Sequence, residues 1–69
     1  MLDVHAIAKN QLANPITDWA VFTVQGNVCL GEISKTDKGF QARDAFGITT
    51  NFRNFMEARD WFASQTTMN

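Results

Sequence analysis

Cysteine, histidine and proline each occur only once in the 69 residues, and tyrosine is absent. The single Cys29 excludes a disulfide within the chain, and together with His5 it leaves too few soft ligands for a structural zinc site. No apolar run approaches the roughly 18 residues that span a membrane, and the first residues lack the pattern of a secretion signal. We therefore expect a cytoplasmic protein without a metal or a membrane-spanning segment.

The sequence also lacks the usual arrangements of catalytic residues. Serine is confined to Ser34, in an expected turn, and Ser64, near the end of the chain, so the pattern contains no Ser/His/Asp triad. The carboxylates are scattered, and the four glycines form no phosphate-binding run. Cys29 lies in an apolar strand pattern and is expected to be a buried structural thiol. The sequence therefore predicts neither an enzyme nor a cofactor site.

What is present favours one small folded domain over residues 1–69, with a frayed tail at 65–69. Hydrophobic residues make up 45% of the chain and include six phenylalanines and two tryptophans, whereas disordered chains are poor in aromatic residues. At this size, the free energy gained by burying apolar surface is nearly cancelled by the conformational entropy lost on folding. Good packing, a partner or self-association must therefore supply the remaining stability. The formal net charge of -1 provides no overall field to attract a polyanion.

The expected fold class is α+β, beginning with a helix over residues 3–13. In that segment the apolar residues recur at helical spacing, Asp3 is a suitable N-cap, and Pro15 follows the end. The residues at this spacing are Val4, Ile7, Ala8 and Leu12.

Strands are expected to follow the first helix, joined by turns that contain glycine. The β-branched and aromatic residues predict strands over 19–24, 28–33 and 40–45, and a short fourth strand or an extended segment over 48–52. Together they would form a three- to four-stranded antiparallel meander.

A second helix is expected after this sheet. Asn54 and Glu57 stand at the N-cap and N3 positions of a capping box, and the apolar residues that follow share one helical face. These residues are Phe55, Ala58, Trp61 and Phe62. We expect this C-terminal helix to pack on the sheet.

The first strand is apolar on both sides, which predicts a surface that needs a cover. Ala20, Phe22 and Val24 would point inward, so Trp19 and Val21 would point to the opposite face. The first helix, a second copy of the chain or a partner protein could cover that face. If a partner does, Trp19 and Val21 are its apolar anchors.

A second candidate surface combines polar residues from the third strand, the fourth segment and the start of the last helix. Its members are Gln41, Arg43, Thr49, Asn51 and Arg53. Arginine and polar side chains on an open sheet face can bind either a phosphate or a protein surface, although they can also form an ordinary solvated face. Arg43 and Asn51 are the polar anchors expected here.

The order of helix, three strands and helix resembles the double-stranded-RNA-binding domain over nearly the whole chain. That family contacts the RNA backbone with a lysine-rich start to its last helix, and residues 53–58 here read Arg-Asn-Phe-Met-Glu-Ala. The segment from Gly39 to Phe62 is also similar to the three-stranded sheet and helix of AP2-type and phage-integrase arm-binding domains. Both resemblances imply nucleic-acid binding, the second through the sheet with Arg43.

The leading functional prediction is a small non-enzymatic protein-binding module, such as a regulator or inhibitor of a larger complex of the bacterial, phage or plasmid accessory type. The alternative is a nucleic-acid-binding domain that uses its sheet face. Homodimerisation is also predicted, because the core is small and one apolar face of the sheet needs a cover, which a second copy of the chain could provide.

Overall fold

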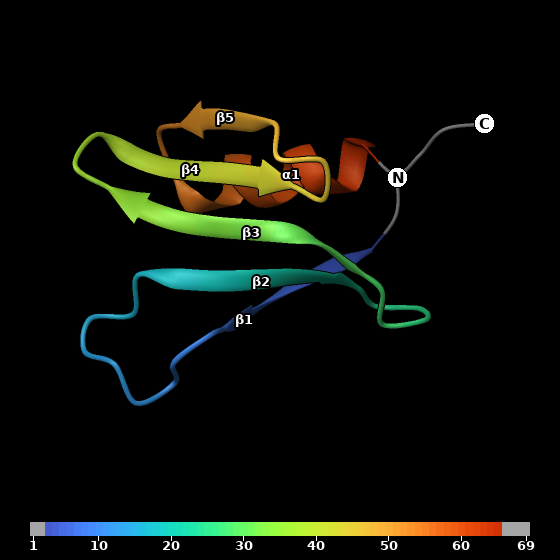
Figure 1. Cartoon of the computed structure of the whole chain (residues 1–69), viewed down its shortest axis with the longest axis horizontal. Coiled ribbons are helices and arrows are strands. Elements are labelled where there is room, and N and C mark those ends of the chain that lie inside the picture. Colours follow the sequence, from blue (N-terminus) through green and yellow to red (C-terminus); the bar gives the residue numbers. More distant parts are fainter. Residues whose placement is uncertain (1–2, 66–69) are drawn as a thin grey trace.

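The computed structural model describes residues 3–65, without the side chain of Gln65, and contains a five-stranded sheet followed by one helix (Figure 1). The elements are β1 (Val4–Ala8), β2 (Asp18–Thr23), β3 (Cys29–Thr36), β4 (Gly39–Asp44), β5 (Thr49–Phe52) and α1 (Phe55–Gln65). The tail expected at 65–69 lies outside the described residues, apart from Gln65, with which α1 ends.

The sheet is a simple antiparallel meander. Its order is β1-β2-β3-β4-β5, so each strand pairs with its neighbours in the sequence. A bulge between Val21 and Phe22 shifts the register of β2 against β3. The Thr23 hydroxyl closes the turn before β3, because it accepts a hydrogen bond from the backbone N–H of Val28 at 2.9 Å.

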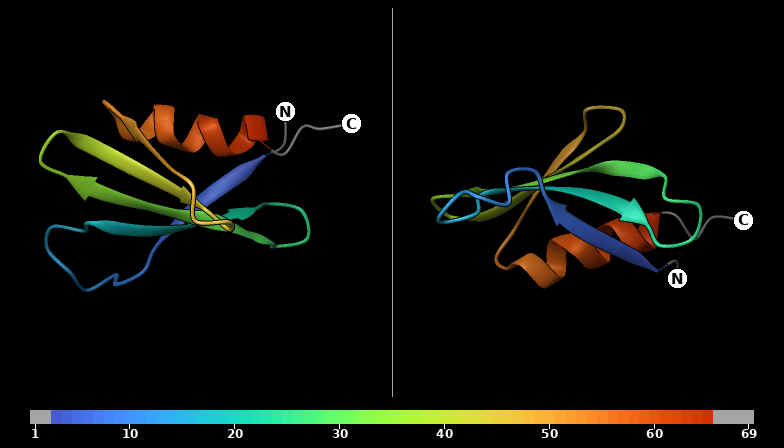
Figure 2. Two further views of the ribbon diagram at one scale, coloured as in Figure 1. Left: turned by 45° about the horizontal axis from the view of Figure 1, so that its top comes forward. Right: turned by 90° about the horizontal axis from the view of Figure 1, so that it is seen from below.

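The core lies between one face of the sheet and α1, which runs along that face (Figure 2). Three central strands contribute Val21, Ile33 and Ala42, and the helix contributes Ala58 and Phe62. All five side chains are enclosed. Burial of these apolar groups between sheet and helix is the main stabilising contribution in a chain of this size.

The expected N-terminal helix is wrong, and with it the helix–strands–helix order on which the likeness to the double-stranded-RNA-binding domain depended. Residues 4–8 instead form β1, which pairs with β2 from Val4 opposite Thr23 to Ala8 opposite Trp19. In a run this short, apolar residues can fit both the helical and the strand period. The strand is favoured because pairing with β2 satisfies the backbone groups that face β2 and places Ala6 against the core.

The C-terminal helix is confirmed, together with its N-cap. The Asn54 Oδ1 atom accepts a hydrogen bond from the backbone N–H of Glu57 at 2.9 Å. Replacing Asn54 with alanine is expected to lower the free energy of unfolding by about 1 kcal/mol, because this N–H loses its partner. Chemical denaturation would measure the change. Asn54→Asp is the control, since it keeps a capping oxygen, and an equal loss in both variants would contradict the role of the cap.

No helix between residues 3 and 65 has both the length and the apolar character needed to cross a membrane.

Candidate binding surface

The sheet has one face covered by α1 and one open face. Successive side chains of a strand point to opposite faces, so the cross-strand register identifies the residues that share the open face. One row across all five strands consists of Ile7, Ala20, Glu32, Arg43 and Thr49. The neighbouring row consists of Asp18, Ser34, Gln41 and Asn51. On the other side of the first row, His5 pairs with Phe22.

Most of the polar patch expected from the sequence is brought together on this face. Gln41 lies opposite Asn51, and Arg43 lies opposite Thr49, on the paired strands β4 and β5. Arg53 follows the end of β5 and is exposed. The alternation of side chains along two strands therefore gathers residues that are separated in the sequence.

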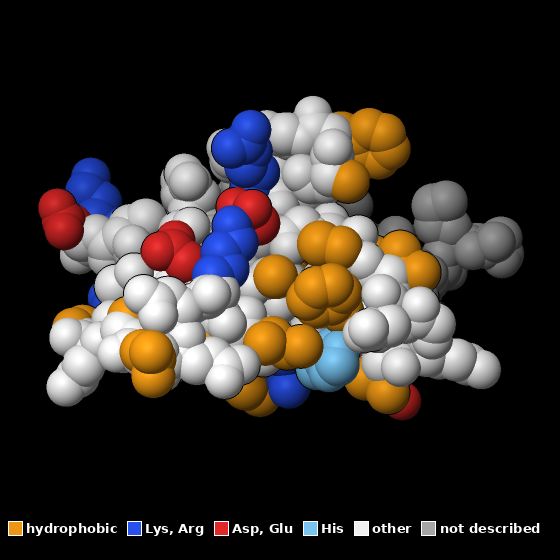
Figure 3. Space-filling model, turned by 60° about the horizontal axis from the view of Figure 1, so that its bottom comes forward, with side chains coloured by type: hydrophobic (Ala, Val, Ile, Leu, Met, Phe, Trp, Pro, Cys, Tyr) orange, Lys and Arg blue, Asp and Glu red, His pale blue; other side chains and the backbone are white. Residues whose placement is uncertain are grey.

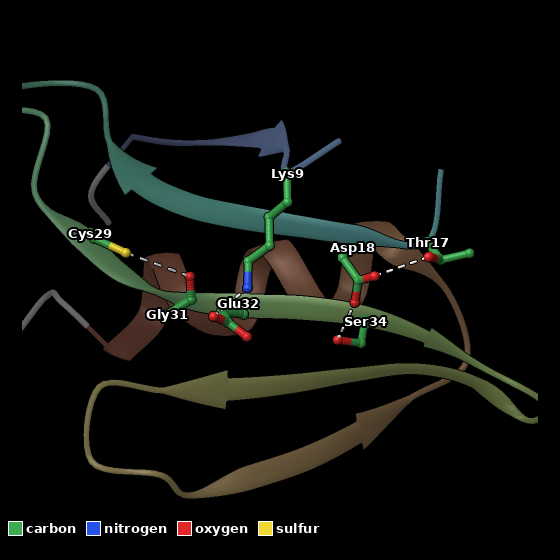
Figure 4. A network of polar contacts seen from close by, with 7 residues as sticks. All are labelled: Lys9, Thr17, Asp18, Cys29, Gly31, Glu32 and Ser34. Atoms are coloured by element: carbon green, nitrogen blue, oxygen red, sulfur yellow. Dashed lines mark hydrogen bonds and ion pairs between the residues drawn. The ribbon is translucent and has the colours of Figure 1, made fainter. Parts of the chain in front are cut away.

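Several polar groups of the open face already have partners (Figure 4). The ammonium group of Lys9 reaches diagonally across β2 to form an ion pair with Glu32 on β3, and the β2 residue opposite Glu32 is the small Ala20. The Asp18 carboxylate accepts hydrogen bonds from the hydroxyls of Ser34, at 2.9 Å, and Thr17, at 3.0 Å. These groups are already paired within the chain, so they are not free to bind a ligand.

Arg43 differs from these groups because its guanidinium has no hydrogen bond or ion pair with any residue that the structure describes. It is exposed, and the side-chain amides of Gln41 and Asn51 beside it likewise have no partner within residues 3–65. A guanidinium and two amides can donate several hydrogen bonds to carboxylate or carbonyl oxygens. The polar end of the face therefore retains its full capacity to donate hydrogen bonds.

Two shallow hollows border this polar end. One, of about 340 Å³, lies beside Arg43 and Glu32, and its other lining residues are Cys29, Gly31, Asp44 and Ala45. The other, of about 370 Å³, lies beside Gln41 and Asn51 and is further lined by Thr36, Asp37, Lys38, Phe40 and Phe52. Each is large enough to receive a side chain of a partner, with Arg43 or Asn51 at its border.

The other end of the open face is apolar. The rings of His5 and Phe22 meet edge to face with 5.9 Å between their centroids, and Ile7 is 39% exposed. Cys29, which is paired with Phe22, is exposed rather than buried as expected. Figure 3 shows hydrophobic side chains gathered around the histidine, next to a group of acidic and basic side chains.

An ordered loop presents further apolar surface between β4 and β5. The Asp44 carboxylate accepts hydrogen bonds from the backbone N–H groups of Phe46 and Ile48, both at 2.9 Å. The Phe46 side chain is 90% exposed on this loop. Two backbone hydrogen bonds also hold the loop, from the Gly47 N–H to the Asp44 carbonyl and from the Asp44 N–H to the Ile48 carbonyl. Because four hydrogen bonds already order the loop, a partner that binds the Phe46 ring pays little additional ordering entropy.

The two apolar anchors expected on β2 lie on the covered face. Val21 is completely enclosed, and Trp19 is half-buried against Phe55, at 4.9 Å between ring centroids, and Phe40, at 5.9 Å. The expected inward and outward faces of β2 are therefore exchanged. Val21 has no surface for a partner, and Trp19 is occupied by the core, so neither belongs to the candidate surface.

The sequence reasoning missed Phe22 as a residue of the open face, although a signal was present. Glu32, Gln41 and Arg43 mark the solvent side of β3 and β4. Aligning the first hairpin would have placed Ala20 beside Glu32, which puts Phe22 on the same side. Charges on neighbouring strands are thus better guides to the open face than the hydrophobicity of β2 alone.

Within residues 3–65, no three histidine, cysteine or acidic side chains lie close enough together to hold a metal ion. No protein-family model matches the chain, and comparisons with curated proteins and with solved structures find no significant match.

Proposed function

We propose that this protein is a small non-enzymatic module that binds a partner protein with the open face of its sheet. The observation that carries the proposal is that α1 covers only one face. The other face presents hydrogen-bond donors without a partner in residues 3–65 at one end, and partly exposed aromatic side chains at the other end. Arginine and aromatic residues of this kind are enriched at protein interfaces. Arg43 and Asn51 are the polar anchors, and Phe22 replaces the anchors formerly expected on β2.

The charge distribution favours a protein over a nucleic acid as the partner. In the rows described above, and with Lys9 at their edge, Arg43 and Lys9 are balanced by Asp18 and Glu32. A surface that carries both positive and negative charges gains little binding free energy from the release of counterions when it binds a phosphate backbone. A protein surface with a carboxylate opposite Arg43 and an apolar region opposite Phe22 fits this arrangement better.

Reversing the charge at Arg43 tests the proposal. We expect Arg43→Glu to reduce capture of the partner by about tenfold or more, because an acidic side chain would replace the unpaired donor at the polar anchor. Wild type and variant would each be immobilised and exposed to the same host lysate, and the retained proteins would be quantified by mass spectrometry. Asn51→Ala should reduce capture of the same proteins to a smaller degree.

Arg59→Glu provides the matched control, since it makes the same charge change on α1, away from the open face. The supporting result is a protein retained by wild type and by Arg59→Glu but depleted with Arg43→Glu, with all three folded by circular dichroism. Equal retention by the wild type and both variants would overturn the assignment of the open face.

The nucleic-acid alternative has a separate test. A filter-binding titration at about 50 mM salt would retain DNA or RNA if the sheet bound the phosphate backbone, and retention would fall as salt increased. Retention that Arg43→Glu abolishes would replace the protein-binding proposal. Absence of retention would eliminate the alternative.

A further inference from the structure

The strand β1 forms an open edge of the sheet. Among the described strands it pairs only with β2, and α1 lies beside it on the covered side of the sheet (Figure 2, right). The backbone N–H of Lys9 donates to the Asp18 carbonyl, and that of Val24 donates to the Asp3 carbonyl, both at 3.0 Å. Because the backbone direction alternates, Asp3, Ile7 and Lys9 face β2 and the N–H and C=O groups of Val4, Ala6 and Ala8 face outward.

Within β1 itself, this edge carries none of the residue types that normally prevent strands from pairing between molecules, although the charged Asp3 and Lys9 flank it. The sequence of β1, Val-His-Ala-Ile-Ala, contains no proline, lysine or acidic residue. The bulge of the sheet lies between β2 and β3 rather than in β1. The opposite edge is shorter, since β5 has four residues and the Arg53 N–H that follows it donates to Glu57 at 3.4 Å.

The edge is complementary to itself. If two β1 strands pair antiparallel with Ala6 opposite Ala6, Val4 of each copy lies opposite Ala8 of the other. These are the residues whose backbone groups face outward, so each free N–H meets a free C=O. A shift by one residue would place outward-facing groups opposite inward-facing ones and lose this ladder.

The side chains support the same register. With Ala6 at the centre, Asp3 of one copy lies opposite Lys9 of the other, and His5 lies opposite Ile7. Asp3 and Lys9 are both exposed, so like charges do not face each other at the ends of the paired edge, and Lys9 keeps its ion pair with Glu32 in its own subunit. A register centred on His5 would place Asp3 opposite Ile7 and bring the two imidazoles together.

We propose that two copies of this chain dimerise by antiparallel pairing of β1 with β1 about a two-fold axis at Ala6. Both sheets then become one continuous sheet, with the two α1 helices on one side and the two open faces on the other. His5 and Ile7 of both copies meet at the centre, and Arg43 of each copy lies toward the periphery. This inference is independent of the partner proposed above.

Sedimentation equilibrium with three variants tests the interface. Wild type is expected to be dimeric, whereas Ala6→Pro and Ile7→Lys are expected to be monomeric at the same concentration. Proline at position 6 removes an N–H that has no bond to any residue from 3 to 65, and lysine at position 7 is a charge of the kind that blocks edge pairing. Thr49→Lys is the matched control, because it adds the same charge to the same face at the other edge, and it should remain dimeric.

A monomeric wild type at the highest attainable concentration would overturn the proposal, as would dimeric Ile7→Lys with native circular dichroism. Ala6→Pro also separates the two proposals, since it changes no side chain of the open face. If it is monomeric, folded and still captures the partner, the open face acts without the dimer. If dimerisation fails in wild type while Arg43→Glu still loses the partner, only the dimer is refuted.

The register has its own test in a mixture of isotope-labelled and unlabelled protein. The backbone of His5 in one copy should lie opposite that of Ile7 in the other, with about 4.5 Å between their Cα atoms, which produces a strong Hα–Hα nuclear Overhauser effect. Within one strand the same residues are about 7 Å apart, too far for a strong signal. A dimer without this signal between copies would show that the copies pair elsewhere.

Discussion

Replacing Phe62 with alanine is expected to lower the free energy of unfolding by about 3–5 kcal/mol. Phe62 is the largest of the fully buried side chains and is 1% exposed, in the cluster that joins α1 to Val21 and Ile33. Its removal leaves a cavity where the helix meets the centre of the sheet. Urea denaturation followed by circular dichroism would measure the loss, which is a large fraction of the stability of a typical small domain.

The matched control for this prediction is Met56→Ala on the same helix. Met56 is 55% exposed, and the change should alter the free energy of unfolding by no more than about 0.5 kcal/mol. A Phe62 variant as stable as the Met56 variant would show that α1 does not close the core in the way described.

Replacing Gly31 with alanine is expected to destabilise the fold by roughly 2–5 kcal/mol. A Cβ atom at this position would overlap the carbonyl oxygen of Arg43 on β4 and lie 2.8 Å from Cε1 of Phe62. The backbone φ angle of Gly31 is +155°, which side-chain-bearing residues rarely adopt. The glycine thus lets the helix aromatic and the neighbouring strand approach β3 closely. Thermal and urea denaturation of the variant would measure the loss.

Gly47→Ala separates the steric effect from the backbone effect. Gly47 has a φ angle of +87°, but no atom lies within 4 Å of the position that its Cβ would take. Alanine there should cost only about 1–2 kcal/mol for the unfavourable backbone conformation. If Gly31→Ala costs no more than Gly47→Ala, the close approach of Phe62 to β3 is not essential to the fold.

The local elements after residue 18 were predictable because short-range chemistry specifies them. Alternating β-branched and aromatic residues produced the strands, including the short β5, and Asn54 with Glu57 marked the start of α1. The N-terminal segment was not predictable in this way, since its apolar residues fit two periods. Only pairing with β2, a segment distant in the sequence, selected the strand.

The candidate surface was predictable only in part for a related reason. Arg43 and Asn51 were expected in one polar patch because they lie on the third strand and the fourth segment, and the structure places them on the same face in neighbouring rows. Val21 was expected on the surface because β2 is apolar on both sides, and hydrophobicity cannot show which side of such a strand meets the helix. His5 joined the open face once its segment became β1.

By itself, the sequence determined which residues prefer strands, where the last helix begins, and that the chain has no apolar segment long enough to span a membrane. The tertiary structure alone decided the conformation of residues 4–8 and which face of the sheet α1 covers. The physical reason is that propensity and capping depend on a few neighbouring residues. Strand pairing and core packing depend on contacts between segments that are distant in the sequence and meet only in the folded state.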